Sequence, residues 1–179
     1  MFGKLAFLCV TFTFLFATGI AQPPCGRSIA ESPSLAGFRL GMSIDETQAA
    51  LGSKYKIPKK KTGEGSYFED FAKAPAVGDL SGVHALFLRF FNFKLYQIEI
   101  FYEDPAKPKK LEEFTQSLSS NLDLPPDAWH FKNQRAEINC GDFAVTADTL
   151  LNPHVELTDD AAYKQFQEKQ QEDKKKARK

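Results

Sequence analysis

The sequence predicts an α+β protein in which an antiparallel sheet, built from two hairpins, carries helices on one face. Two pairs of short segments rich in β-branched and aromatic residues flank tight turns, at 83–102 and at 135–148. Segments with capping residues and apolar residues at helical spacing lie between and after them. The 179 residues, 26% charged and 42% apolar, fit one globular domain. Because 23 basic residues balance 23 acidic ones, nucleic acid is not expected as a partner.

The N-terminal segment 1–21 has the pattern of a secretory signal peptide. Lys4 supplies the positive start, residues 5–16 form the apolar stretch, and Gly19 and Ala21 are the small residues of a cleavage site. A membrane anchor is the alternative, but the apolar run is shorter than the roughly 20 residues that span a bilayer. We therefore expect a secreted or periplasmic protein of the bacterial envelope, with no transmembrane span in the mature chain.

Residues 22–37 read as an irregular, proline-containing leader. After removal of the signal peptide, two cysteines remain, Cys25 and Cys140, and an even number in an exported chain predicts one disulfide. The bridge would close a loop of 116 residues, which is worth at most about 4 to 5 kcal/mol. Two unpaired thiols, with Cys140 buried in a strand, are the alternative.

The single compact domain is expected over residues 38–166, and its first element is a helix of about two turns. Ser43 and Glu46 have the spacing of a capping box, and Gly52 is placed to end the helix. Its apolar face consists of Ile44, Thr47 and Leu51.

Glycine, proline and lysine dominate residues 53–82, which predicts a loop, with a short strand at 55–57 as an alternative. A hairpin follows, formed by 83–91 and 94–102. Strict alternation places one set of side chains towards the helices: Leu86, Leu88, Phe90, Tyr96, Ile98, Ile100 and Tyr102. The same alternation places the other set on the opposite side: Phe87, Arg89, Phe91, Leu95, Gln97, Glu99 and Phe101.

A second helix is predicted to begin at Asp104 and Pro105, a cap followed by a first-turn proline. It should end at Leu124, before two prolines. Its apolar residues recur at spacings of three and four: Leu111, Phe114, Leu118 and Leu122.

The second hairpin is formed by 135–140 and 143–148, and a short strand at 154–157 follows it. A last helix begins at 158–160 and is expected to dock by one turn, through Tyr163 and Phe166. Residues 167–179 are then a charged, mobile tail.

A shift of 67 residues aligns the two parts of the domain, 38–103 and 104–158. Ile44 then matches Leu111, and Leu51 matches Leu118. Two tandem modules, each a helix followed by a hairpin, would explain the match. Convergence of two segments on one packing solution is the alternative.

The segment from Phe38 to Gly52 contains Gly41-Met42-Ser43, then Asp45-Glu46, a short helix and Leu51-Gly52. It resembles the opening of small envelope proteins of the SmpA/OmlA (BamE)-like type and of the related β-lactamase-inhibitor-protein-like fold. The resemblance implies a helix-plus-antiparallel-sheet module that binds other proteins, sometimes as two modules in tandem. The sequence departs from the lipoproteins among them in having no cysteine in a lipidation context and in the long loop at 53–82.

Motifs that carry chemistry are not found, so no catalytic residue, metal site or cofactor site is expected. The sequence has no nucleophile elbow, phosphate loop or zinc-protease motif. His84, His130 and His154 have no ligand spacing and are expected to be ordinary surface histidines. Lysine runs at 59–61, 107–110 and 174–179 are more typical of solvated loops and tails than of a site, although weak contact with an anionic surface is compatible with them.

Two functions remain from different classes. The first is a non-catalytic protein-interaction module whose partner is another envelope or secreted protein. The second is an exported small-molecule-binding protein or hydrolase with a site built from scattered residues. The first has a candidate interaction face on the first hairpin: Phe87, Arg89, Phe91, Leu95, Glu99 and Phe101. Burial of this face under the loop at 53–82 is the alternative.

Overall fold

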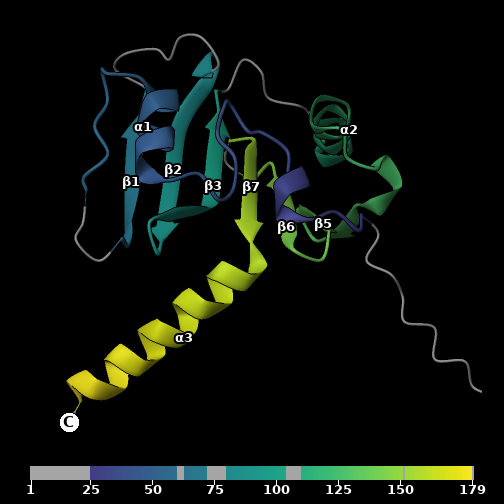
Figure 1. The fold of residues 1–179 in the computed structure, drawn as a ribbon. Helices are drawn as coiled ribbons and strands as arrows, with labels where there is room; N and C mark the ends of the chain where they lie inside the picture. The colour runs from purple at the N-terminus through teal and green to yellow at the C-terminus, as the bar shows by residue number, and fades with distance from the viewer. Residues whose placement is uncertain (1–24, 60–62, 72–79, 104–109, 151, 179) are drawn as a thin grey trace, which may run out of the picture.

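A computed structural model describes residues 25–59, 63–71, 80–103, 110–150 and 152–178. It contains one antiparallel sheet of seven strands in the order β1-β2-β3-β7-β6-β5-β4, together with three α-helices (Figure 1). The α+β class is therefore confirmed, and the sheet is larger than two hairpins. The expected signal peptide lies outside the described residues.

The first three strands are consecutive in the chain. β2 (Val83–Phe91) and β3 (Lys94–Tyr102) form the predicted hairpin. Its two turn residues, Asn92 and Phe93, both have positive φ, which matches the right-handed twist of the strands. β1 (Gly65–Asp70) pairs antiparallel with β2 in the region predicted as a loop. The alternative strand at 55–57 does not form.

The other four strands come from the second half of the chain. β5 (Arg135–Asn139) and β6 (Phe143–Asp148) form the second predicted hairpin. β4 (His130–Lys132) adds an edge strand that the sequence pattern does not reveal. β7 (His154–Asp159) pairs with both β6 and β3, so it joins the two sets of strands into one sheet.

Two helices cover one face of the sheet, as predicted. α1 (Ile44–Leu51) begins with the expected capping box: Glu46 N donates to Ser43 Oγ at 3.2 Å, and Ser43 N donates to Glu46 Oε2 at 2.7 Å. α2 (Leu111–Leu122) begins later than predicted, because Lys110 is extended and Leu111 is the first buried residue of the periodic pattern. Asp104 and Pro105 lie outside the described residues.

The main core lies between these two helices and the sheet. Leu86, Leu88, Ile98 and Ile100 from the first set of strands are fully buried there, and Val145 and Leu157 continue the layer into the second set. The starts of α1 and α2 are 67 residues apart, which is the shift that aligns the two halves in sequence. Each helix precedes three strands of a meander, β1-β2-β3 and β5-β6-β7, with β4 as an addition to the second. The tandem origin of the halves stays a prediction.

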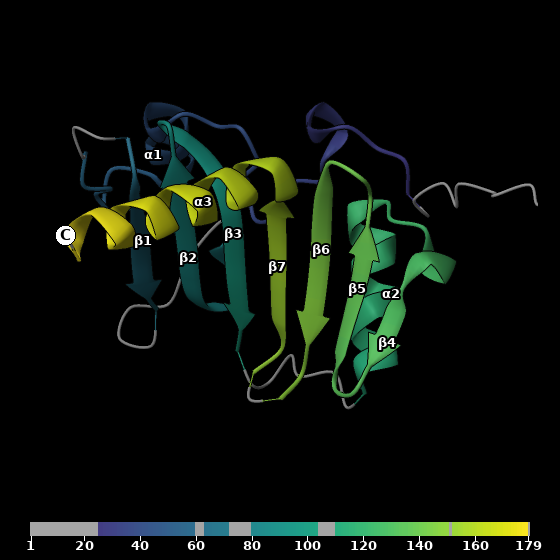
Figure 2. The same ribbon diagram turned by 90° about the horizontal axis from the view of Figure 1, so that it is seen from below.

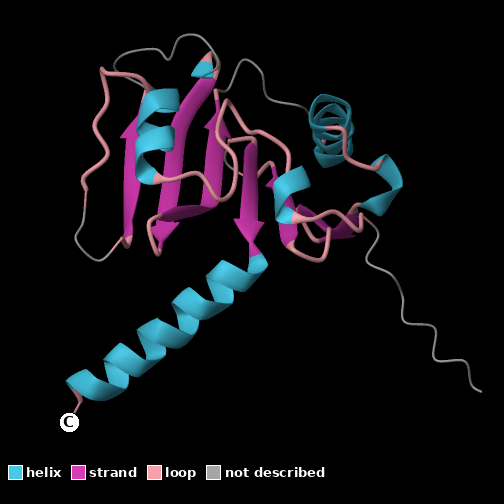
Figure 3. Cartoon of the chain, viewed as in Figure 1, coloured by secondary structure: helices cyan, strands magenta, loops and turns pink. Residues whose placement is uncertain are grey.

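The third helix, α3 (Asp160–Ala177), lies on the other face of the sheet. Figure 2 shows it crossing β3, β2 and β1 on the side opposite α1 and α2, and Figure 3 shows its length relative to the strands. The expectation of helices on one face thus holds for α1 and α2 only. Asp159 caps α3 by accepting from Ala162 N at 2.8 Å. The helix continues to Ala177, beyond the single docked turn that the sequence predicts.

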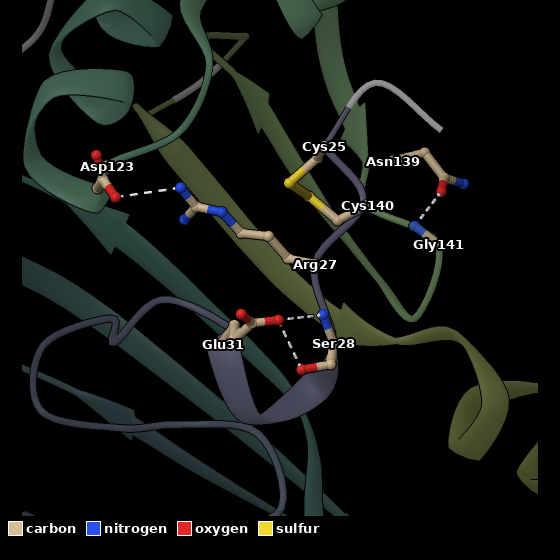
Figure 4. The surroundings of a disulfide bond; sticks show 8 residues. All are labelled: Cys25, Arg27, Ser28, Glu31, Asp123, Asn139, Cys140 and Gly141. Carbon is tan, nitrogen blue, oxygen red and sulfur yellow. Dashed lines mark hydrogen bonds and ion pairs between the residues drawn. A yellow bond between two sulfur atoms is a disulfide. The ribbon is translucent and has the colours of Figure 1, made fainter. Parts of the chain in front are cut away.

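The predicted disulfide between Cys25 and Cys140 is present (Figure 4). It ties the leader to the end of β5, and Arg27 pairs with Asp123 at 3.1 Å beside it. Leu35 and Phe38 follow the leader into the core. Within the part of the chain that is described, no helix is both long and apolar enough to cross a membrane.

Candidate functional site

The face of the sheet opposite α1 and α2, here called the outer face, carries most of the residues predicted to form an interaction surface. Phe87, Arg89, Glu99 and Phe101 lie on it together, in neighbouring positions of β2 and β3. Phe91 also lies on this face, but it is buried because Phe166 of α3 packs against it, with ring centroids 6.0 Å apart.

Leu95 is not on the outer face, and this part of the prediction is wrong. Arg89 pairs with Gln97, whereas the next residue of β2, Phe90, pairs with Leu95, so β3 has a bulge at Tyr96. The extra residue reverses the alternation. Leu95 is completely buried in the main core, and Tyr96 instead packs against Phe166 of α3 with ring centroids 5.4 Å apart.

A row of rings crosses the outer face from β1 to β7, here called the aromatic row. The ring centroids of Phe68 and Phe87 are 4.3 Å apart, and those of Phe87 and Phe101 are 6.1 Å apart. Phe101 stacks on His154 with a centroid distance of 4.3 Å. Phe68 is 50% exposed. The row is present because β1 lies beside β2 at the sheet edge, where Tyr67 enters the core and Phe68 points to the opposite side. The described part of the loop at 53–82 therefore extends this face instead of covering it.

Polar side chains run beside the aromatic row and hydrogen-bond to one another. Arg89 Nη1 donates to Gln97 Oε1 at 2.5 Å and pairs with Glu99 Oε1 at 2.9 Å. Gln97 Nε2 donates to Glu156 Oε1 at 2.8 Å, and Thr158 Oγ1 donates to the same oxygen at 2.9 Å. These bonds link β2, β3 and β7 and fix the rotamers of the groups they join.

The carboxyl of Glu99 is in an unfavourable environment for its charge. Burial raises its pKa, the Arg89 guanidinium opposes this shift, and the neighbouring Glu156 carboxylate adds to it. Only 12% of the Glu99 side chain is exposed. The network therefore contains more negative charge than Arg89 alone offsets.

His154 is a member of this site, although the sequence predicts an ordinary surface histidine. Only 13% of its side chain is exposed. Its Nδ1 lies 3.1 Å from Asp148 Oδ2, and its Nε2 lies 3.9 Å from Glu99 Oε2. Neither His154 nor Asp148 can be assigned from alternation, because their position depends on β7 lying between β3 and β6. The ligand atoms of Glu99, His154 and Glu156 all lie within 4.8 Å of one another.

α3 covers one end of the outer face. Tyr163 and Phe166 pack against Tyr96, and Lys169 forms an ion pair with Glu64. Burial raises the pKa of Tyr96 to about 12. A pocket of about 550 Å³ remains beside the helix. Its lining includes Glu64, Ser66, Arg89, Tyr163, Gln167 and Gln170.

A second pocket, of about 590 Å³, lies at the far edge of the sheet. His130, Lys132, Arg135, Glu137 and Leu150 contribute to its lining. His130 is exposed, as the sequence predicts, and His84 is half-buried on β2.

Comparison of the chain with protein-family models, with curated proteins and with solved structures gives no match.

Proposed function

We propose that the protein is an exported, non-catalytic module that binds another envelope or secreted protein through the outer face of its sheet. The observation that carries the proposal is the aromatic row, which ends at the half-exposed Phe68 and adjoins a hydrogen-bonded polar network. Aromatic residues and arginine are enriched at the centres of protein interfaces, where they supply most of the binding free energy.

The scaffold under this surface supports the same proposal. Phe68, Phe87 and Phe101 come from three adjacent strands whose pairing fixes their spacing. Arg89, Gln97 and Glu99 hold one another in place. A surface held in this way loses little conformational entropy when a partner binds. The helix-plus-strands halves also agree with the binding module that the sequence resemblance implies.

An exported location is supported by two observations. The Cys25–Cys140 disulfide is of the kind that persists in oxidising compartments. The first 21 residues have the pattern of a signal peptide. The protein is thus proposed to meet its partner in the periplasm or outside the cell.

A photo-crosslinking amino acid placed at position 68 in the producing cells tests the proposal. Position 131 provides a matched control, because Phe131 is also 50% exposed but lies on the other face of the sheet. Its cross-strand partner is Ala136, whose side chain faces the main core. We expect a specific crosslinked protein at position 68 and none at 131. The purified partner should bind the wild type, and Phe68→Ser should weaken that binding at least about tenfold, the loss expected for an aromatic anchor.

Equal crosslinking at both positions, or unchanged binding by Phe68→Ser, would contradict the proposal. Since Phe68 is half exposed, its replacement should cost little stability, so a loss of binding cannot be attributed to unfolding. The matching Phe131→Ser variant should retain full affinity.

Small-molecule binding is the second candidate, and the pocket beside α3 favours it. Its volume of about 550 Å³ is within the range of ligand sites, and Glu64, Arg89 and Gln167 give it polar lining groups. A thermal-shift screen of small polar metabolites, with Gln167→Ala as the comparison, tests this function. Stabilisation of the wild type but not of the variant would support it, and stabilisation of neither would count against it.

A further inference from the structure

The strongest unassigned feature is a group of four side chains from three adjacent strands. Glu99 lies on β3, His154 and Glu156 lie on β7, and Asp148 lies on β6. Pairing places Glu99 opposite Glu156 and His154 opposite Asp148. One ligand atom from each of Glu99, His154 and Glu156 lies within 4.8 Å of the other two.

The orientation of His154 is the first argument for a ligand. The Asp148 carboxylate, whose Oδ2 lies 3.1 Å from Nδ1, accepts a hydrogen bond from the Nδ1–H group. In the neutral ring this leaves the Nε2 lone pair free, which is the tautomer that metal-binding histidines adopt when a carboxylate orients them. Among the described residues, Nε2 of His154 is buried without a hydrogen-bond partner. A buried nitrogen left in this state costs free energy unless something else binds it.

The charge balance is the second argument. The group contains three carboxylates, those of Glu99, Glu156 and Asp148. Two guanidinium groups lie beside them: Arg89 pairs with Glu99, and Arg135 of β5 lies opposite Asp148 and donates to Thr146. With His154 neutral, the three carboxylates outnumber the two guanidinium groups, so the group keeps a net negative charge that a bound cation would offset.

The remaining contacts are those of a supported ligand set. Arg89 holds Oε1 of Glu99, while Oε2 faces His154. Gln97 and Thr158 both donate to Oε1 of Glu156, and Oε2 lies outside these two bonds. Each carboxylate is therefore oriented through one oxygen while the other stays free of these contacts. Hydrogen bonds of this kind orient metal ligands and raise affinity.

We infer that Glu99, His154 and Glu156 form a binding site for a divalent transition-metal ion of the zinc class, in which Asp148 orients His154. The mixed nitrogen and oxygen donors suit Zn²⁺ better than Mg²⁺ or Ca²⁺, which prefer oxygen ligands alone. Bonds of about 2.0–2.2 Å require the three side chains to move slightly closer than they are here. Three protein ligands leave a tetrahedral ion one position for water. The inference does not depend on the proposed protein partner.

Titration of the purified full chain, stripped of metal by a chelator, tests the site with Zn²⁺ alone. Isothermal calorimetry should show one ion bound per chain, and Co²⁺ in its place should give the visible absorption of a tetrahedral site. His154→Gln and Glu156→Gln should abolish binding. Asp148→Asn should weaken it by about 10- to 100-fold, the range found when a residue that orients a metal ligand is replaced.

His130→Gln is the matched control, because His130 is an exposed histidine at the edge strand β4. It should bind Zn²⁺ as the wild type does. Equal weakening by His130→Gln and His154→Gln would show adventitious surface binding and overturn the inference. So would a wild-type dissociation constant weaker than about 1 mM. Chemical denaturation of each metal-free variant checks folding, and the Asp148→Asn result stands by itself if His154→Gln does not fold.

Discussion

Tyr96 is the residue of β3 at which the alternation of side chains between the two faces of the sheet is interrupted. As the extra residue of a bulge, it leaves the alternation of β3 and packs under α3, while Leu95 enters the main core. Its hydroxyl is thereby removed from solvent, and burial raises its pKa to about 12. One inserted residue thus determines both the packing of the core and the attachment of the last helix.

Tyr96→Phe should reduce the loss of stability at alkaline pH. Unfolded tyrosine ionises near pH 10, whereas folded Tyr96 stays protonated up to about 12. Its contribution to stability is therefore complete below about pH 10 and is lost as the pH rises through about 12. Urea denaturation at about pH 8 and about pH 11 should show the wild type losing roughly 1 kcal/mol more than the variant. Equal losses in both proteins would mean that Tyr96 titrates like an exposed tyrosine.

At this scale the sequence predicts neighbours within one hairpin but not across strands that are distant in sequence. Phe87, Arg89 and Glu99 are correctly placed together because a two-residue turn fixes their register. The sequence does not predict that His154 and Asp148 belong to the site, because no local pattern indicates which strand pairs with β3. Leu95 is misplaced for a different reason: strict alternation assumes that no strand has a bulge.

α3 has no buried residue, whereas α1 and α2 each bury one face against the core. Its ring contacts with the sheet come from Tyr163 and Phe166, and residues 171–178 are all exposed. The positive charges of the lysines in the last turn interact favourably with the negative end of the helix dipole. This interaction stabilises the exposed part of the helix. Two rings and the ion pair between Lys169 and Glu64 therefore hold the helix on the outer face.

Two variants of α3 should differ clearly in stability. Phe166→Ala removes a ring that contacts both Phe91 and Tyr96, and it should cost about 1–2 kcal/mol because the ring is only partly buried. The melting temperature should then fall by roughly 2–8 °C. Truncation after Gln171 removes exposed residues only and should change the melting temperature by no more than a degree or two. A large effect of the truncation would show that the end of α3 binds something.

Elements with strong local signals are the ones predicted correctly. The capping box of α1 and the turn of the first hairpin are set by neighbouring residues. β1 is missed because Gly65-Ser66 is a poor strand sequence, and the pairing of every β1 residue with β2 overrides that propensity. β4 has three residues, too few for alternation to be recognised.

For the molecule as a whole, one sheet and one disulfide connect segments that are far apart in the chain. β7 joins the first three strands to the last three, and Cys25 joins the leader to Cys140. The sequence predicts the bridge because two cysteines remain once the signal peptide is excluded. It does not predict the strand order, because many orders satisfy the same pattern of elements.

Replacing both cysteines by serine should lower stability without changing the fold. The closed loop has a sequence separation of 115, and the entropy it removes from the unfolded chain is worth up to about 4–5 kcal/mol, with typical values of 2–4. Urea denaturation of Cys25→Ser/Cys140→Ser against the oxidised wild type measures the difference. Under reducing conditions the free energies of unfolding of the two proteins should become nearly equal. A difference that persists after full reduction would show that the serines, and not the missing bridge, cause the loss.

The position of β7 also has a kinetic consequence. It is the last strand in the chain order, yet it occupies the middle of the sheet. Until it inserts, β3 and β6 both present an open edge, and among the described residues no strand pairing joins the two groups of strands. Across this pairing, the side chains of Gln97 and Glu156 hydrogen-bond although the two residues are separated by 59 positions, and contacts of such long range form slowly. Folding should therefore be limited by the insertion of β7, and intermediates that lack it carry two exposed edges at which neighbouring chains can pair.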